Sequence, residues 1–128
     1  MKKTIGVILL AIFTLLVIII FSIIYITKLK VTDVGEYENE NNHYMVLFQA
    51  IGEPEWPFGR TKVRVTLLDS QKKKVETFEE YLQDDGAIAR EENIEVEWQE
   101  EEVKITLKGG EQEDSIHKIK YKSGWNNF

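Results

Sequence analysis

Hydrophobic residues form one continuous run near the N-terminus and short alternating segments farther along the chain. Between Ile5 and Ile26 there are 22 residues without a charge, and 17 of them are Ile, Leu, Val or Phe. As an α-helix rising about 1.5 Å per residue, this run extends roughly 33 Å, enough to cross a hydrocarbon core of about 30 Å. A helix that is apolar on every side does not suit a small soluble domain. The run therefore predicts a transmembrane helix over residues 5–27.

The charged residues at the two ends of this helix predict its orientation. Lys2 and Lys3 precede it with no acidic residue beside them, whereas Lys28 and Lys30 are soon outnumbered by acids. Under the positive-inside rule, residues 1–4 lie in the cytoplasm and the C-terminal part lies outside the cell membrane.

A cleaved signal peptide is the main alternative to a membrane anchor. The apolar region of a signal peptide is normally about 7–15 residues long and ends in small residues. Here the run is longer and ends in Ile23-Ile24-Tyr25-Ile26-Thr27-Lys28. We therefore expect an uncleaved signal anchor that crosses the membrane once. Thr14 and Ser22 offer hydroxyls to a partner helix, although without a small-xxx-small pair the simpler interpretation is that they face lipid.

A polar linker is expected between the helix and the folded domain, over residues 28–42. The stretch from Glu36 to Asn42 is rich in Glu and Asn and has no apolar residue other than Tyr37. This composition is typical of a solvated tether. An ordered extracytoplasmic domain is then predicted over residues 43–122, followed by a tail of residues 123–128.

Alternation with a period of two predicts β-strands after His43. Residues 44–50 are apolar at both alternating sets of positions, which is typical of a strand in the middle of a sheet. Residues 62–67 alternate Val63, Val65 and Leu67 with Lys62, Arg64 and Thr66. This second pattern predicts a strand with one face in water.

Residues 94–107 give the clearest prediction, a β-hairpin with a defined register. A turn at Glu100-Glu101 places Trp98 opposite Val103, Val96 opposite Ile105 and Ile94 opposite Leu107 on the buried face. The same register places Glu97 opposite Lys104 on the solvent face, so both faces agree. A further strand is predicted over residues 116–122, with His117, Ile119 and Tyr121 on one side and Lys118, Lys120 and Lys122 on the other.

The stretch from Val75 to Leu82 fits two structures. Its first residues suit a strand, whereas the spacing of Phe78, Tyr81 and Leu82 suits one helical turn. Five or six short antiparallel strands in this space predict an all-β domain, a small sandwich or open barrel, preceded by one transmembrane helix.

Composition excludes several classes of protein. The chain has 128 residues, room for one domain. It has no cysteine, which excludes disulfides, thiolate zinc sites, iron–sulfur clusters and a thiol nucleophile. After Lys30 the chain holds all 22 acidic residues but only 12 of the 16 basic ones, a net charge of −10. No nucleic-acid partner is therefore expected.

The residues that carry enzyme chemistry show no recognisable motif. Ser70, Ser115 and Ser123 lie outside any G-x-S-x-G sequence, and a histidine on an inward strand face, as at His117, is more often packed than catalytic. The acidic clusters have no D-x-D-x-D-G spacing; they are Asp84-Asp85, Glu91-Glu92, Glu100-Glu101-Glu102 and Glu111–Asp114. We predict no catalytic residue, no metal ligand, no cofactor and no enzyme activity.

The most distinctive segment is the connection Gly52-Glu53-Pro54-Glu55-Trp56-Pro57-Phe58-Gly59-Arg60, which holds both prolines of the chain. Proline restricts the backbone, so one interpretation is a rigid loop that presents its aromatic residues to a partner. The predicted partner-binding residues are Trp56, Pro57, Phe58 and Arg60, because aromatic residues and arginine are enriched in binding hot spots. In the alternative interpretation the loop folds back and its aromatic residues cap the core.

These residues carry a resemblance to a known group of proteins. The pattern includes Gly52-Glu53-Pro54, Trp56-Pro57-Phe58-Gly59, Val63-Arg64-Val65, Asp85-Gly86, Val96-Glu97-Trp98, Val103 to Leu107 and Gly110-Glu111-Gln112. Over roughly residues 43–121 the chain is similar in layout to small membrane-anchored or lipoprotein β-domains of low-GC Gram-positive bacteria, in the group of domains of unknown function labelled DUF5412. This chain lacks the lipobox cysteine of the lipoprotein members, and a transmembrane helix would replace it. The resemblance implies an extracytoplasmic β-domain and brings no catalytic residue.

Two functions are compatible with these patterns. The first is a membrane-tethered interaction module, which binds an envelope or membrane protein through the Trp56-Pro57-Phe58 loop or an exposed strand edge. The second is an envelope protein that binds a small ligand or a cation such as Ca²⁺ through its acidic loops. We take the first as the working hypothesis; the patterns do not predict an oligomeric state.

Overall fold

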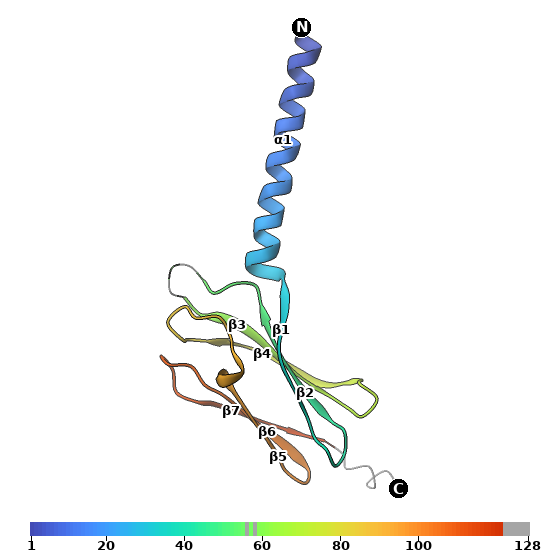
Figure 1. Cartoon of the computed structure of the whole chain (residues 1–128), viewed down its shortest axis with the longest axis vertical. Coiled ribbons are helices and arrows are strands. Elements are labelled where there is room, and N and C mark those ends of the chain that lie inside the picture. Colours follow the sequence, from blue (N-terminus) through green and yellow to red (C-terminus); the bar gives the residue numbers. More distant parts are fainter. Residues whose placement is uncertain (56, 58, 122–128) are drawn as a thin grey trace.

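A computed structural model describes residues 1–55, 57 and 59–121 of the chain. Its N-terminal element is a long straight helix, α1 (Lys2–Ile24), which continues into a π-helical turn over Tyr25–Leu29. No residue from Lys2 to Leu29 is buried against the rest of the chain. The helix stands clear of the remaining structure (Figure 1), and its length and composition are those of a membrane anchor or a signal sequence.

The described residues after the helix form seven strands, which are arranged in two antiparallel sheets. The first sheet contains β1 (Val31–Glu38), β2 (Met45–Ile51), β3 (Thr61–Leu68) and β4 (Lys74–Leu82) in sequential order. The second contains β5 (Ile94–Trp98), β6 (Glu102–Leu107) and β7 (Ser115–Lys120), preceded by a 3₁₀ turn over Glu91–Asn93. Consecutive strands are neighbours within each sheet, so each sheet is a simple meander.

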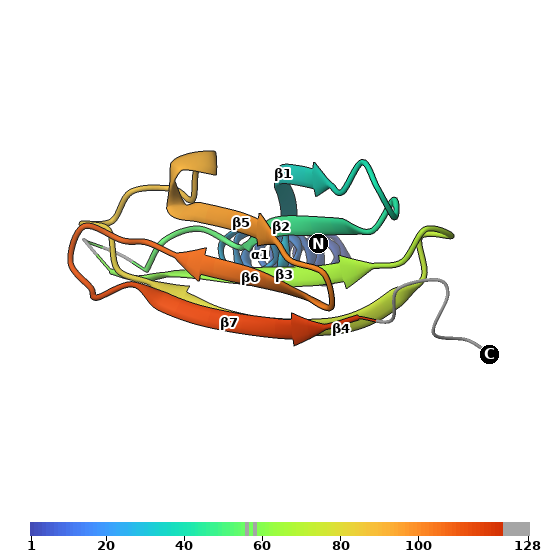
Figure 2. The same ribbon diagram turned by 90° about the horizontal axis from the view of Figure 1, so that it is seen from below.

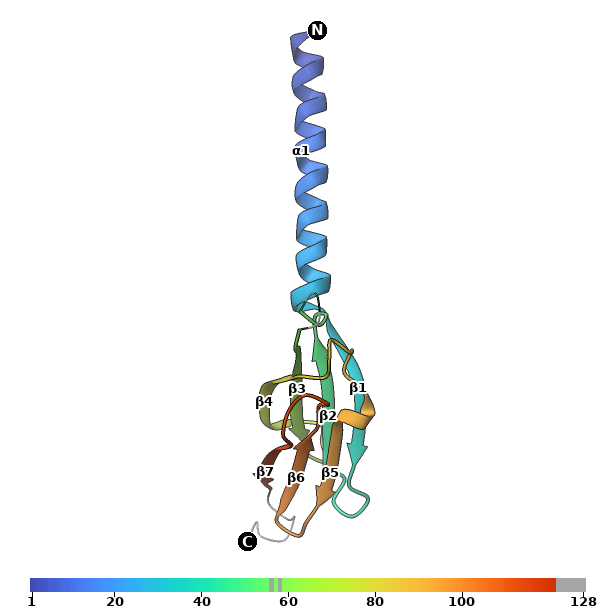
Figure 3. The same cartoon turned by 90° about the vertical axis from the view of Figure 1, so that its left-hand side faces the viewer.

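The two sheets pack face to face around one core. In the view along the helix axis, β6 lies beside β3 and β7 beside β4 (Figure 2). The buried side chains come from the inward positions of both sheets: Val46, Phe48, Val63, Val65, Leu67 and Leu82 from the first, and Ile94, Val103, Ile105, Leu107 and Ile119 from the second. Figure 3 shows β5, β6 and β7 in front of the larger sheet. The predicted all-β fold after one helix is therefore confirmed, as a sandwich.

The predicted hairpin is confirmed residue by residue. In β5 and β6, Trp98 pairs with Val103, Val96 with Ile105, and Ile94 with Leu107. On the solvent face Glu97 lies opposite Lys104, and their charged atoms are 3.9 Å apart. The strand predicted after this hairpin is β7, in which Lys118 and Lys120 are exposed and Ile119 is buried.

The stretch from Val75 to Leu82, which fitted both a strand and one helical turn, is a strand. It belongs to β4, which pairs with β3 along its whole length. Cross-strand contacts on the outer face favour this pairing: Arg64 bonds Glu79, and the hydroxyls of Thr66 and Thr77 lie 2.9 Å apart.

The linker predicted over residues 28–42 is wrong, because β1 occupies most of it. Val31, Thr32 and Val34 are β-branched, and Tyr37 packs against the core, so this segment gains more as a strand than as a tether. β1 pairs with β2 from Val31 opposite Ile51 to Glu38 opposite Met45, with a bulge between Asp33 and Gly35. The ordered domain thus begins at Val31, and Lys30 alone separates the helical turn from β1.

Residues 39–44 are a tight turn between β1 and β2. The Asn39 N–H donates to the Tyr44 carbonyl at 2.7 Å, and the His43 N–H donates to the Asn39 carbonyl at 2.8 Å. The Asn39 side chain also accepts the N–H of Asn41 at 3.0 Å. The Asn-rich composition therefore reflects turn formation, for which asparagine is well suited, rather than disorder.

Candidate functional site

The C-terminal end of the helix is bound to the loop that follows β2. The Glu53 N–H donates to the Thr27 carbonyl at 2.9 Å, and the Gly52 N–H donates to the Lys30 carbonyl at 2.7 Å. The last carbonyls of a helix have no partner within the helix and need one from elsewhere. The β-domain supplies two such donors, so the helix and the domain are joined by specific hydrogen bonds as well as by the chain itself.

Gly52 is required for this close approach. Its φ is +70°, a backbone conformation in which residues other than glycine are strained. A Cβ atom at this position would lie 2.2 Å from the Thr27 carbonyl oxygen, far inside contact distance. The absence of a side chain at Gly52 therefore permits the junction between loop and helix.

The loop between β2 and β3 closes on itself at its far end. The Glu55 N–H donates to the Arg60 carbonyl at 3.0 Å, and the Gly59 N–H donates to the Glu55 carbonyl at 2.6 Å. The Arg60 Nε donates to a carboxylate oxygen of Glu55 at 3.2 Å. Figure 1 shows this loop beside the base of the helix.

The four predicted partner-binding residues belong to this loop. Pro57 and Arg60 are exposed to solvent. Trp56 and Phe58 lie outside the residues that the structure describes, as do the tail residues 123–128. The choice between a presented loop and one whose aromatic residues cap the core therefore stays open.

Charged side chains from β3 and β4 continue the surface next to the loop. The Arg60 guanidinium lies over the Tyr81 ring, 3.8 Å from its centre, a cation–π geometry. The Glu79 carboxylate accepts from Lys62 Nζ and from Arg64 Nη2, both at 3.0 Å. Hydrogen bonding from Lys62, and then from Arg64, lowers the pKa of Glu79, and the same carboxylate raises the pKa of Lys62.

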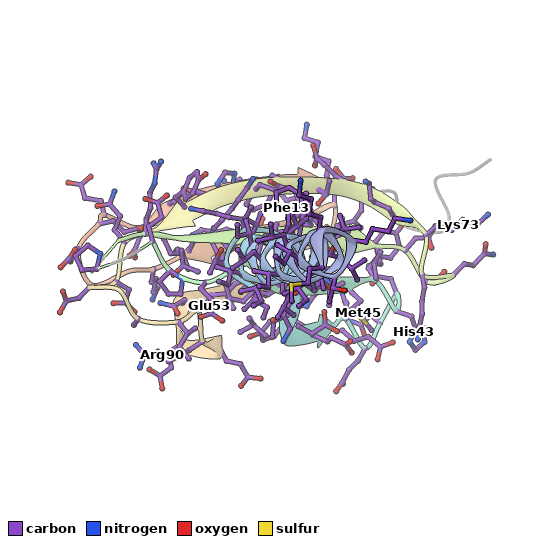
Figure 4. The ribbon with its side chains drawn as sticks, turned by 90° about the horizontal axis from the view of Figure 1, so that it is seen from above. Phe13, His43, Met45, Glu53, Lys73 and Arg90 are labelled. Atoms are coloured by element: carbon purple, nitrogen blue, oxygen red, sulfur yellow. The ribbon has the colours of Figure 1, made fainter. Side chains whose placement is uncertain are left out.

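Arg60, Lys62 and Tyr81 are among the residues that line a cavity of about 140 Å³, which we call the junction cavity. Its wall is formed by the helix end, by the start of the loop and by the outer ends of β3 and β4; the lining residues are Thr27, Lys28, Ile51, Glu53, Glu55, Arg60, Lys62 and Tyr81. Seen from above, Glu53 lies close to the helix and Lys73 lies at the far end of the domain (Figure 4). Three lining side chains are cationic and two are carboxylates.

Sequence reasoning identified Arg60 but missed Lys28, Glu53, Lys62 and Tyr81. The alternating pattern correctly places Lys62 on a solvent face, and nothing in the pattern brings it to the helix end. The signal that could have found the site is Gly52 followed by a charged residue immediately after a strand, since glycine there marks a close backbone approach.

In the described part of the chain, neither histidine is arranged as in a serine triad. His117 Nε2 lies 2.7 Å from a Glu80 carboxylate oxygen and 3.2 Å from the Ser115 hydroxyl, and its ring stacks on Phe78 at 4.0 Å. In a serine triad the acid and the serine contact different ring nitrogens, whereas here both contact the same one. His43 lies in the exposed turn, 3.4 Å from Glu38.

Asp84, in one of the acidic clusters, has a structural role. Asp84 Oδ1 accepts the Gly110 N–H at 2.8 Å, and Oδ2 accepts from Asn93 at 3.3 Å and from Arg90 at 3.1 Å. These donors, Gly110 first, hold the pKa of Asp84 below its usual range, against a smaller opposing effect of burial. Within residues 1–55, 57 and 59–121, no three His, Asp or Glu side chains are grouped as a metal site requires.

The hydroxyls of Thr14 and Ser22 form hydrogen bonds within the helix. Thr14 Oγ1 donates to the Leu10 carbonyl at 2.9 Å, and Ser22 Oγ donates to the Ile18 carbonyl at 2.8 Å. A hydroxyl has one hydrogen to donate, so both donors are engaged inside the helix.

Comparisons with known proteins give no match: no family model fits the chain, and searches of curated proteins and of solved structures each find none. The resemblance to small membrane-anchored β-domains of Gram-positive bacteria therefore stays a prediction.

Proposed function

We propose that this chain is a single-pass membrane protein whose extracytoplasmic β-domain is an interaction module for another protein of the cell envelope. The N-terminus is cytoplasmic and the apolar helix is an uncleaved anchor. Support for an uncleaved anchor comes from the junction, because cleavage on the C-terminal side of Lys30 would remove the carbonyls of Thr27 and Lys30 that accept hydrogen bonds from the domain.

The observation that carries this proposal is the position of the loop between β2 and β3. Its first two residues, Gly52 and Glu53, are bonded to the end of the helix, so the loop is held beside the point where an anchor leaves the bilayer. Its Trp-Pro-Phe sequence and Arg60 are of the residue types that dominate binding energy in protein interfaces. The partner is therefore a membrane protein, or an envelope protein bound close to the membrane surface.

Substitution of Trp56 tests this function directly. In cells expressing the full-length protein, the Trp56→Ala variant is expected to lose a stoichiometric cross-linked partner while its melting temperature stays within about 2 °C of the original, as for a surface change of a few tenths of a kcal/mol. The measurement combines cross-linking, co-purification and a thermal melt of the same variant.

Trp98 provides the matched control. It belongs to β5 and meets the Tyr121 ring edge-on at 6.0 Å, in the core of the sandwich rather than in the loop. The Trp98→Phe variant should melt earlier and still retain the partner. A parallel loss of partner and melting temperature in Trp56→Ala would contradict the proposal and indicate that Trp56 packs against the core.

A further inference from the structure

The junction cavity is locally basic within a strongly acidic domain. The chain after Lys30 has a net charge of −10, yet Lys28, Arg60 and Lys62 line this cavity against two carboxylates, Glu53 and Glu55. The domain contributes two cations and two carboxylates to the lining, and Lys28 of the helix brings the net charge to +1, an excess that favours an anionic group at this position.

Two of the cations have donors to spare among the described residues. Arg60 bonds Glu55 through Nε and stacks on Tyr81, which orients the guanidinium but leaves both terminal nitrogens without an acceptor there. Lys28 Nζ likewise has no acceptor within the described part of the chain. A planar guanidinium fork together with an ammonium group is the combination that recognises phosphate oxygens.

The two carboxylates of the cavity differ in their hydrogen bonds. Glu55 is bonded to Arg60, whereas the Glu53 side chain is exposed and has no hydrogen bond or ion pair with a described residue. Glu53 therefore offers an acceptor for a positive group in the same cavity lining as Lys28 and Arg60. A ligand that carries both a phosphate and an amine satisfies the free charges of the cavity.

The cavity also has a suitable size and place. The cavity volume of about 140 Å³ is far above the roughly 10–15 Å³ that a single water molecule requires, so a phosphate group fits. Thr27 and Lys28 close the cavity at the end of the apolar helix, the level at which phospholipid headgroups meet a membrane anchor.

We infer that the junction cavity binds a phosphoethanolamine group, with Lys28 and Arg60 on the phosphate and Glu53 on the amine, supplied by a phospholipid headgroup or by a free soluble phosphoethanolamine. Lys62, fixed by Glu79, adds positive charge without a direct contact. The inference rests on the proposed membrane anchor and is independent of any protein partner.

Native mass spectrometry of the full-length protein released from nanodiscs tests this inference. With equal amounts of phosphatidylethanolamine and phosphatidylglycerol, the protein is expected to retain phosphatidylethanolamine preferentially. Arg60→Gln and Lys28→Gln should each lower retention by about tenfold or more, the effect of losing a charged hydrogen bond. Glu53→Gln should remove the preference for phosphatidylethanolamine over phosphatidylglycerol.

Arg64→Gln is the matched control. Arg64 bonds Glu79 as Lys62 does, but it lies outside the cavity lining, so this variant should retain lipid as the original does. Lys28 belongs to the helix and not to the sandwich, which keeps Lys28→Gln informative even if Arg60→Gln fails to fold.

A second measurement distinguishes the two sources of the ligand. In lipid-free detergent, a rise in melting temperature with phosphoethanolamine, absent in Lys28→Gln, would identify the soluble source; lipid retention without such a rise would identify the headgroup. Equal retention of both lipids by the original protein, or retention unchanged in both cation variants, would overturn the inference. Neither result depends on co-purification of a protein partner, so failure here is distinct from failure of the proposed function.

Discussion

Replacing Gly52 with alanine is expected to open the junction between the helix and the β-domain. The added Cβ would lie 2.2 Å from the Thr27 carbonyl oxygen, and φ of +70° costs a non-glycine residue roughly 1 kcal/mol before any clash is counted. Amide hydrogen exchange of the protein in nanodiscs should therefore show at least about tenfold faster exchange at residues 52 and 53, since each 1.4 kcal/mol corresponds to a factor of ten.

The control for this variant is Gly6→Ala, because a Cβ atom on Gly6 meets nothing within 4 Å. Exchange at the junction should be unchanged in that protein. The strands should keep their protection in both variants, since the core of the sandwich lies away from Gly52. Unaltered exchange at residues 52 and 53 in Gly52→Ala would show that the two hydrogen bonds do not hold the junction closed.

Replacing Asp84 with asparagine is expected to destabilise the β-domain by about 1.5–3 kcal/mol, the range for hydrogen bonds to a charged group. The asparagine oxygen can still accept the Gly110 N–H, but its amide would then face the donors on Asn93 and Arg90. Denaturant unfolding of the full-length protein in detergent measures this change, with Asp85→Asn, in the exposed neighbouring position, as the control.

Asp84 also predicts a dependence of stability on pH. Its pKa in the folded protein lies below its pKa in the unfolded chain, so its contribution is present above the unfolded pKa, near 4, and is lost as the pH falls through the folded value. The free-energy difference between the original protein and Asp84→Asn should therefore shrink from pH 7 to pH 3. A difference that stays constant over this interval would contradict the role assigned to this carboxylate.

The parts of the fold that could be predicted are those in which two independent patterns agree. In the hairpin of β5 and β6 the apolar face and the charged face both require one register, because a shift by one residue would move every side chain to the wrong face. For Val75 to Leu82 a single pattern was compatible with strand and helix, and pairing with β3 decided between them.

The sequence analysis did not predict β1 because many of its residues are polar. Asp33, Glu36 and Glu38 occupy an outward face at the edge of the sheet, where charged residues are common and protect against further strand pairing. Few large side chains of this strand pack against the core, among them Val34 and Tyr37. A composition average over such a strand resembles a linker, although its β-branched residues favour the extended conformation.

The junction cavity could not be predicted, because it depends on contacts between distant parts of the chain. Lys28 and Tyr81 are more than fifty residues apart and belong to different elements, and only the packing of the loop after β2 on the helix end brings them together. The sequence indicated an unusual loop and a basic helix flank separately. The loop and the helix flank come together because Lys30 alone connects the helical turn to β1.

The rigid attachment of the β-domain to the helix is tested most directly by a distance measurement across the junction. Because the chain has no cysteine, Phe13→Cys and Lys73→Cys place two spin labels, one on the helix and one on the turn after β3, both visible in Figure 4. Pulsed electron paramagnetic resonance in nanodiscs should give one narrow distance distribution, which broadens when Gly52→Ala is added. A broad distribution already present with Gly52 intact, on the scale of the roughly 20 Å that a flexible chain of about fifteen residues explores, would contradict the rigid junction.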